Sequence, residues 1–224
     1  MASSTDAVPS PRPAQTRPSP SRWTAKHTLW LLFGLLGISV IFSTELPLLH
    51  SKTGPTHTYL LKLLHDRLLF IPHALCGITA TIIGPLQFSS RLRRKHLRLH
   101  RILGRVYVGA IFIAAPTALI LAWNNPITPS TIAQVAQASL WMLCTLLAFL
   151  AARNRHIVQH RQWMIRSYAV TFSFISTRAL NFIPAYAHMS DANFECLIII
   201  ITTVGAFVIP DIAFHWRELT TRRA

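Results

Sequence analysis

Long apolar runs separated by short basic connections set the narrowest limit on what this chain can fold into. Six stretches approach the roughly 20 apolar residues that a helix needs to cross a bilayer, at about 27–49, 68–89, 102–123, 132–152, 163–186 and 194–216. The chain is 51% hydrophobic and only 13% charged, whereas a soluble domain carries about a quarter of charged residues. We therefore expect an all-α protein, a six-helix transmembrane bundle within residues 26–216.

Lysine and arginine are distributed unevenly between alternate connections. Sixteen of them lie in the N-terminal segment, the second and fourth loops and the C-terminal segment, whereas the odd-numbered loops carry three. Cytoplasmic loops of membrane proteins are enriched in these residues. Both termini and the even loops are therefore predicted to face the cytoplasm, as in a multi-pass protein of the cell inner (cytoplasmic) membrane.

The formal net charge of +15 would indicate a nucleic-acid partner if it covered a soluble face. It lies almost wholly between apolar runs, so the expected partner is the lipid bilayer, with no nucleic acid. Residues 1–25 hold five prolines among serines and arginines, which predicts a disordered basic tail. Residues 217–224 are expected to form a basic cytoplasmic tail. The three cysteines lie singly in apolar runs, which favours neither disulfides nor a thiolate metal site.

Eleven histidines fall into two layers under this topology. His100 and His160 lie near the cytoplasmic face, whereas His73 lies about 9 Å inside the outer boundary, six residues beyond Arg67. A neutral imidazole at the depth of His73 either hydrogen-bonds a carbonyl freed by Pro72 or acts as an axial haem ligand or proton-relay group. Both interpretations are open at the level of the sequence.

Charged residues inside the apolar runs need partners, because an unpaired charge in a bilayer is costly. Arg178 lies at a depth where Glu45 is the acid available to it. Either a Glu45–Arg178 pair fixes helix packing, or Arg178 holds an anionic ligand. Near the cytoplasmic side, Asp211 is expected to pair with Arg105 or Arg166, which leaves the other arginine available for an anion.

Two stretches repeat one pattern, KHLRLHR at 95–101 and RHIVQHR at 155–161. Each holds two histidines four residues apart, which share a helix face and can bind one metal together. Each precedes an apolar run and continues to an arginine and a tyrosine, as HRILGRVY (100–107) and HRQWMIRSY (160–168). This indicates a duplicated helical hairpin, with spans two and three related to spans four and five.

Two kinds of metal chemistry use histidines in this way. Membrane di-iron oxygenases combine this spacing with His-His boxes, which the chain lacks. A b-type haem instead needs one histidine from each of two facing helices. This predicts His100 with His160 as an inner pair, and His73 with His188 or His65 as an outer pair, so that an electron can cross the membrane.

The segments 73–108 and 160–178 resemble a predicted bacterial membrane-protein family known only as domain of unknown function 2306. The resemblance rests on a histidine that opens a span, a Gly-Pro-x-Gln-Phe end, a His-Arg-x-x-Gly-Arg sequence and a His-Arg-x-Trp-Met-x-Arg-Ser-Tyr sequence. The matching residues are His73, Gly84, Pro85, Gln87, Phe88, His100, Arg101, Gly104, Arg105, Tyr107, His160, Arg161, Trp163, Met164, Arg166, Ser167, Tyr168 and Arg178. The resemblance implies no reaction. It gives weight to the second histidine of each pair, because His96 and His156 lie outside the pattern.

We expect an interior polar site built from His73, His100, His160, Arg166 and Arg178, with the histidines as haem-iron ligands. The first functional hypothesis is a haem b protein that transfers electrons across the membrane, with a redox partner or quinone. The alternatives are a transporter or binding protein for a small anionic or quinone-like ligand, and a structural or assembly protein without catalysis. No motif in the sequence specifies an enzyme reaction.

Overall fold

The computed structural model describes residues 61, 65–124, 127–180, 183 and 191–220, except for the side chains of Arg178 and residues 217–220. The predicted N-terminal tail, the predicted first span at 27–49 and the outer-layer histidine His188 lie outside these residues.

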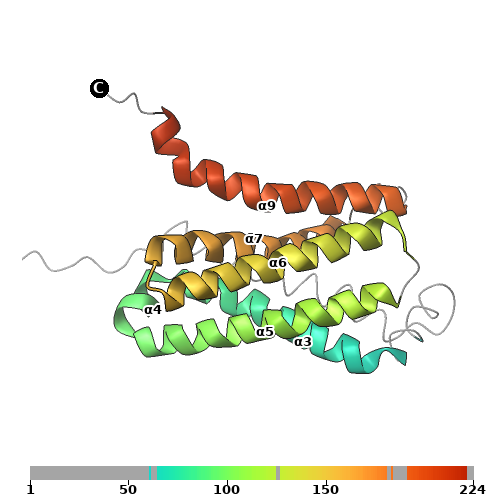
Figure 1. The fold of residues 1–224 in the computed structure, drawn as a ribbon, viewed down its shortest axis with the longest axis horizontal. Coiled ribbons are helices and arrows are strands. Elements are labelled where there is room, and N and C mark those ends of the chain that lie inside the picture. The colour runs from blue at the N-terminus through green and yellow to red at the C-terminus, as the bar shows by residue number, and fades with distance from the viewer. Residues whose placement is uncertain (1–60, 62–64, 125–126, 181–182, 184–190, 221–224) are drawn as a thin grey trace, which may run out of the picture.

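Six helices hold nearly all of the described residues, and no strand occurs among them. They are α3 (Arg67–Gln87), α4 (Ser90–Lys95), α5 (Leu97–Trp123), α6 (Pro129–Arg153), α7 (Ile157–Leu180) and α9 (Ala192–Thr220). The long helices lie side by side in an elongated bundle, with the short α4 at one end (Figure 1). The prediction of an all-α protein is confirmed.

Local signals explain where two of these helices begin. Thr128 Oγ1 accepts a hydrogen bond from Thr131 N at 3.2 Å, and Pro129 follows at the start of α6, where its missing N–H is no loss. Ser89 Oγ caps α4 in the same way by accepting from Leu92 N at 3.3 Å. Each cap satisfies a backbone N–H that has no partner within its own helix.

The helices coincide with predicted spans, but their ends differ. α5 begins at Leu97 instead of near 102, and α7 at Ile157 instead of near 163, because the basic residues before each apolar run already belong to the helix. α7 is described as far as Leu180, and most of the remaining predicted span, to 186, lies outside the described residues. α4 lies in the connection between predicted spans two and three, which was expected to be a loop; four of its six residues are cations.

Within the described part of the chain, four helices are long and apolar enough to cross a membrane: α3, α5, α6 and α9. Large apolar side chains stand on the outside of the bundle, such as Leu68 and Trp123, each 84% exposed. Such a surface suits lipid and not water. The count of six spans and the cytoplasmic side of both termini stay predictions.

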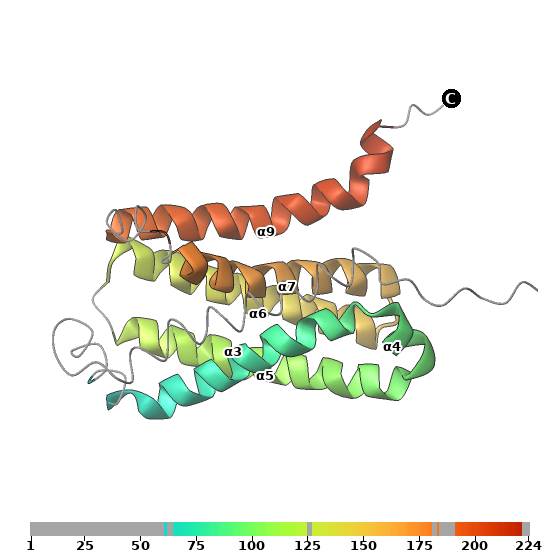
Figure 2. The same cartoon turned by 180° about the vertical axis from the view of Figure 1, so that it is seen from behind.

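α7 is more polar than its neighbours, because serines, threonines and Arg166 interrupt its apolar residues. It packs against α6, α9 and α3, and Figure 2 shows it between α9 and α3, in front of α6. None of its described side chains after Arg161 is exposed. A helix that is surrounded by other helices can carry polar groups, because they find partners in the protein and not in lipid.

Small residues let the helices approach closely in the core. Ala80, Ala114 and Ala148 are completely buried, one on each of α3, α5 and α6. At Gly84 the approach is closer still, because an added Cβ would lie 2.2 Å from ring atoms of Tyr168. The Tyr168 ring on α7 therefore lies directly against the α3 backbone, and this contact holds α3 to α7.

α9 bends toward its C-terminal end, and both views show this last part turning away from the other helices (Figure 1). Pro210 lies inside α9. A proline inside a helix removes one backbone hydrogen bond and clashes with the preceding turn, which bends the helix. The bend lies next to Asp211, the acid predicted to form an ion pair.

Candidate functional site

The two repeated histidine stretches lie at the same end of the bundle. The stretch 95–101 leads from α4 into α5, and the stretch 155–161 leads from the α6–α7 turn into α7. Both views place α4 beside that turn (Figure 2). In each stretch the second histidine donates its backbone N–H to the first, at 3.0 Å from His100 to His96 and at 2.9 Å from His160 to His156. The four-residue spacing is thus one helical turn. The first histidines are exposed, and the second ones are partly buried.

The turn into α7 is tight. Arg155 has φ 62°, a left-handed conformation that glycine usually occupies after a helix. His156 N donates to Ala151 O at 2.8 Å and Arg155 N to Ala152 O at 3.1 Å, which satisfies two carbonyls at the end of α6. This turn places His160 one helical turn inside α7.

The His160 ring is fixed by the backbone of α6. Its Nδ1 lies 2.9 Å from Ala148 O, and because a carbonyl only accepts, Nδ1 must be the donor. In the neutral ring, Nε2 then carries the lone pair. A histidine whose Nδ1–H is held by a carbonyl in this way has the orientation and tautomer of many metal-binding histidines.

His100 and His160 occupy equivalent places on two helices that start at the same end. Tyr107 follows His100 by seven residues, and Ser167 follows His160 by seven. Residues seven apart share a helix face and lie about 10 Å apart along the axis. Since Tyr107 OH lies 3.0 Å from Ser167 Oγ, the two histidines lie at similar depth on helices that meet across the core. They are also close enough to interact electrostatically.

Two buried polar atoms in this region have no hydrogen-bond partner among the residues that the structure describes. One is Nδ1 of His100 itself, and the other is Nε2 of Gln87. Gln87 is only 5% exposed. Its Oε1 lies 3.4 Å from where a Cβ on Gly104 would stand, so the carboxamide rests against α5, one turn beyond His100. A buried donor without an acceptor is costly, so such an atom indicates a bound group or water.

Gln87 is the residue that the predicted site lacks. Its signal in the sequence is a single polar amide in the last turn of an apolar helix, two residues after Pro85. Arg93 Nη1 also donates to Gln87 O at 3.2 Å, so a cation from α4 lies next to Gln87. We call Gln87, His100 and His160 the inner polar cluster.

His73 lies elsewhere. Its Nδ1 donates to Ala114 O at 2.8 Å, so the acceptor of this hydrogen bond belongs to α5 and not to its own helix, where Pro72 was expected to free a carbonyl. His100 precedes Ala114 by 14 residues, which is about 21 Å along the axis. The structure therefore separates His73 from the inner polar cluster. His65, the proposed outer partner, is exposed and lies on the same segment as His73, not on a facing helix.

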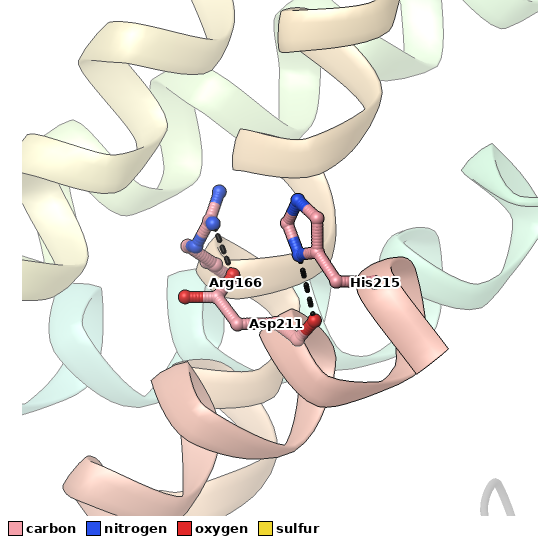
Figure 3. A network of polar contacts seen from close by, with 3 residues as sticks. All are labelled: Arg166, Asp211 and His215. Atoms are coloured by element: carbon pink, nitrogen blue, oxygen red, sulfur yellow. Dashed lines mark hydrogen bonds and ion pairs between the residues drawn. The ribbon is translucent and has the colours of Figure 1, made fainter. Parts of the chain in front are cut away.

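Arg166 forms the predicted ion pair with Asp211, which ties α7 to α9 beside the bend (Figure 3). The guanidinium also lies over the rings of Trp163 and Phe214, with its Cζ at 4.9 and 6.0 Å from the ring centroids. His215 Nδ1 donates to Asp211 O at 2.9 Å, one turn along α9. With an acid and two rings as its partners, Arg166 acts as a packing group between two helices.

The other two predicted arginines are not brought to the inner polar cluster. Arg105 is exposed, so it is not a buried anion-binding residue in this chain. Arg178 belongs to α7 near its C-terminal end, which lies 18 residues, or about 27 Å, from His160. Glu45, its predicted partner, lies outside the described residues.

Hydroxyl groups fill the centre of the bundle beyond the inner polar cluster. Tyr107 OH lies 3.0 Å from Ser167 Oγ and 3.2 Å from Thr171 Oγ1. Thr145 Oγ1 lies 2.8 Å from Ser167 Oγ. Thr145 donates to Trp141 O at 2.8 Å and Thr171 to Ser167 O at 3.0 Å. Because both ends give their protons to backbone carbonyls, these groups form a satisfied packing network and not a route for a proton.

Comparison with known proteins agrees with the membrane character of the fold. The sequence model of a family described as predicted membrane protein (DUF2306) matches residues 70–214, a range that includes the inner polar cluster. No curated protein and no solved structure matches the chain.

Proposed function

Because the chain belongs to the DUF2306 family of predicted membrane proteins, whose description states no activity, we propose a function from its own histidines. The protein binds one b-type haem between His100 and His160 and transfers electrons in the membrane. A haem held in this way supplies one-electron oxidation and reduction.

The facing positions of the two histidines carry this proposal. They lie on two helices of equal direction, seven residues before a Tyr107–Ser167 contact of 3.0 Å. His160 has its Nδ1–H tied to a carbonyl at 2.9 Å, which leaves Nε2 as the coordinating nitrogen, and His100 has a buried Nδ1 without a partner among the described residues. Two imidazoles from facing helices are what a b-type haem requires.

The chemistry of the surroundings favours haem over a bare metal ion. No group of three or more histidine, cysteine or acidic side chains that could hold a metal occurs within the described ranges, and a structural metal site commonly needs four ligands. Haem needs only two from the protein. The amide of Gln87 and the nearby cations Arg93 and Arg101 suit the carboxylates that haem carries.

The orientation that we propose for the protein in the membrane rests on the cations at the end of the bundle that holds the inner polar cluster. α4, the α6–α7 turn and the C-terminal end of α9 lie at the same end of the bundle (Figure 1). The exposed cations in and around α4 and the α6–α7 turn are Arg91, Arg93, Arg94, Lys95, Arg98, Arg101, Arg153, Arg155 and Arg161. The positive-inside rule places this end in the cytoplasm. We assign six spans, both termini inside, and the cytoplasmic membrane, with a redox partner or a quinone as the second carrier.

Visible spectra of the purified protein, produced in cells with ample haem, test the proposal. The expected result is a Soret band that shifts on reduction with dithionite and is lost in His100→Ala and in His160→Ala. The repeats supply matched controls, because His96→Ala and His156→Ala remove exposed histidines one turn away and should keep the spectrum.

A colourless wild-type protein that unfolds cooperatively refutes the haem proposal. So does a spectrum that survives both His100→Ala and His160→Ala. Loss of colour in the control variants as well would place the ligands elsewhere, and circular dichroism of every variant shows whether the helices are intact.

The membrane orientation has its own test. A maleimide reagent that cannot cross the membrane is applied to intact cells that carry single cysteines in a cysteine-free background. Ile127→Cys, in the turn between α5 and α6, should be labelled, whereas Arg94→Cys on α4 should react only after the cells are opened. The reverse pattern contradicts the assigned orientation.

A further inference from the structure

A cavity of about 100 Å³ lies between α3, α5, α6 and α7, well away from the inner polar cluster. α3 forms one wall with His73, Gly77 and Thr81, which are four residues apart and therefore share one face. A Cβ built on Gly77 meets no described atom within 4 Å. The missing side chain of Gly77 is thus one reason why the space exists.

The size of the cavity limits what can occupy it. A closed cavity of about 150 Å³ in a protein core accommodates a benzene molecule. The present cavity is smaller, but it is not fully enclosed, so it suits no more than a single six-membered ring whose substituents lie in the opening. A haem, with four pyrrole rings, is far too large for it. The cavity is therefore a second place in the molecule, independent of the proposed haem.

The walls are mainly apolar, and aromatic rings contribute to them through Phe70, Trp141 and Phe174. Such walls favour a ring over water, because apolar and aromatic surfaces gain contact with a ring and offer water few hydrogen bonds.

The hydroxyl and indole N–H groups of the wall already donate hydrogen bonds within the protein. Trp141 Nε1 donates to Thr171 Oγ1 at 2.9 Å, and Thr171 donates to Ser167 O at 3.0 Å. Thr81 Oγ1 donates to Gly77 O at 2.9 Å, which leaves an oxygen that can only accept. A ligand that hydrogen-bonds to this wall must therefore bring the donor.

We propose that this cavity is a binding site for a hydroxylated six-membered ring, a phenol or the ring of a membrane quinol, with Thr81 Oγ1 accepting the ligand's O–H. The ring packs between α3 and the aromatic residues of α6 and α7. The site does not depend on the haem proposal, so either can fail without the other.

Phenol and toluene are a suitable pair of probes, because they have nearly the same size and only phenol has a donor. The full chain, purified in detergent, is titrated with each, and the unfolding temperature is recorded. A ligand that binds only the folded state raises this temperature. Phenol is expected to raise it more than toluene does.

Two variants locate the effect. Gly77→Leu fills the cavity and should abolish the phenol shift, whereas Gly109→Leu should retain it, because Gly109 lies on the exposed side of α5 and its added Cβ also meets no described atom within 4 Å. Thr81→Val keeps the shape and removes the acceptor. It should weaken phenol binding about fivefold, as loss of one neutral hydrogen bond does, and leave toluene unchanged.

Equal shifts with phenol and toluene, in both wild type and Thr81→Val, overturn the assignment of a hydroxylated ligand. A phenol shift that persists in Gly77→Leu, or no shift at all, overturns the site itself. If Gly77→Leu does not fold, Thr81→Val alone decides, by whether phenol loses affinity relative to toluene. A short-chain alkyl quinol in place of phenol distinguishes the two sources: tighter binding than phenol indicates a membrane quinol, and weaker binding a free phenol.

Discussion

Gly84→Ala inserts one methyl group between α3 and the ring of Tyr168. The added Cβ would lie 2.2 Å from both Cδ2 and Cε2 of that ring, and 3.3 Å from Cγ. Carbon atoms pack at about 3.5–4.0 Å, so the ring or the helix has to move by roughly 1.5 Å. Tyr168 is 9% exposed, and its neighbours leave little room for that movement.

The expected cost has two parts. Overpacking of a close-packed core costs about 1–3 kcal/mol. Displacing Tyr168 also disturbs its edge-on contact with Phe88, whose ring centroid lies 5.7 Å away, and such a pair is worth about 0.5–1.5 kcal/mol. The hydrogen bond from Tyr168 OH to Thr81 O is long, at 3.4 Å, and adds little. The free energy of unfolding should fall by about 2–4 kcal/mol.

The assay is thermal unfolding of the purified protein in detergent, followed by circular dichroism. At about 2–4 °C per kcal/mol for a chain of this length, the unfolding temperature should fall by roughly 5–15 °C. Gly109→Ala is the matched control, because its new methyl group meets no described atom within 4 Å. Replacing a glycine within a helix by alanine there should stabilise the protein by about 0.5–1 kcal/mol.

A second background separates the clash from other effects of alanine at this position. In Tyr168→Ala the ring is gone, so Gly84→Ala should cost little, and a double-mutant cycle should report a coupling of about 2 kcal/mol or more. An unfolding temperature unchanged by Gly84→Ala, or an equal decrease in both backgrounds, would show that α3 and α7 do not meet in this way.

Three further features of the structure are tested by the same unfolding assay. In a double-mutant cycle, Arg166→Gln and Asp211→Asn should show a coupling of only about 1 kcal/mol, because the Asp211 side chain is 47% exposed and the charges are screened; additive effects would mean that the ion pair does not contribute. Arg155→Gly should raise the free energy of unfolding by about 1 kcal/mol, since glycine adopts the φ of 62° without strain, and a destabilised variant would contradict the left-handed turn. Tyr107→Phe removes the hydroxyl 3.0 Å from Ser167 Oγ and should cost about 1 kcal/mol; an unchanged stability would argue against the hydroxyl network.

Much of the fold could be predicted from the sequence, because membrane helices leave a strong pattern. A helix in lipid must satisfy its backbone internally and face the lipid with apolar side chains, so long apolar runs mark α3, α5, α6 and α9 directly. The ends were harder, as α5 and α7 show, because a helix can continue beyond the apolar layer with charged residues that resemble a loop.

The site was only partly predictable, and the inner polar cluster shows why. The repeated motif and the family resemblance identified His100 and His160 as the interior members of each pair, and one helical turn separates them from the exposed His96 and His156. Gln87 was overlooked as a site residue. Its burial against α5 depends on how α3 is rotated, which the Gly-Pro-x-Gln-Phe sequence around it does not reveal.

The sequence by itself determined the helical class, the apolar spans, the excess of cations in alternate loops and the need for Asp211 to find an arginine. Tertiary structure decided that the arginine is Arg166, that His73 bonds to Ala114 on another helix, and that His73 lies about 21 Å from the level of His100. Periodicity along one helix shows which residues share a face. The partner across the bundle depends on the relative depth and rotation of two helices, which are set by packing contacts such as that of Gly84 with Tyr168.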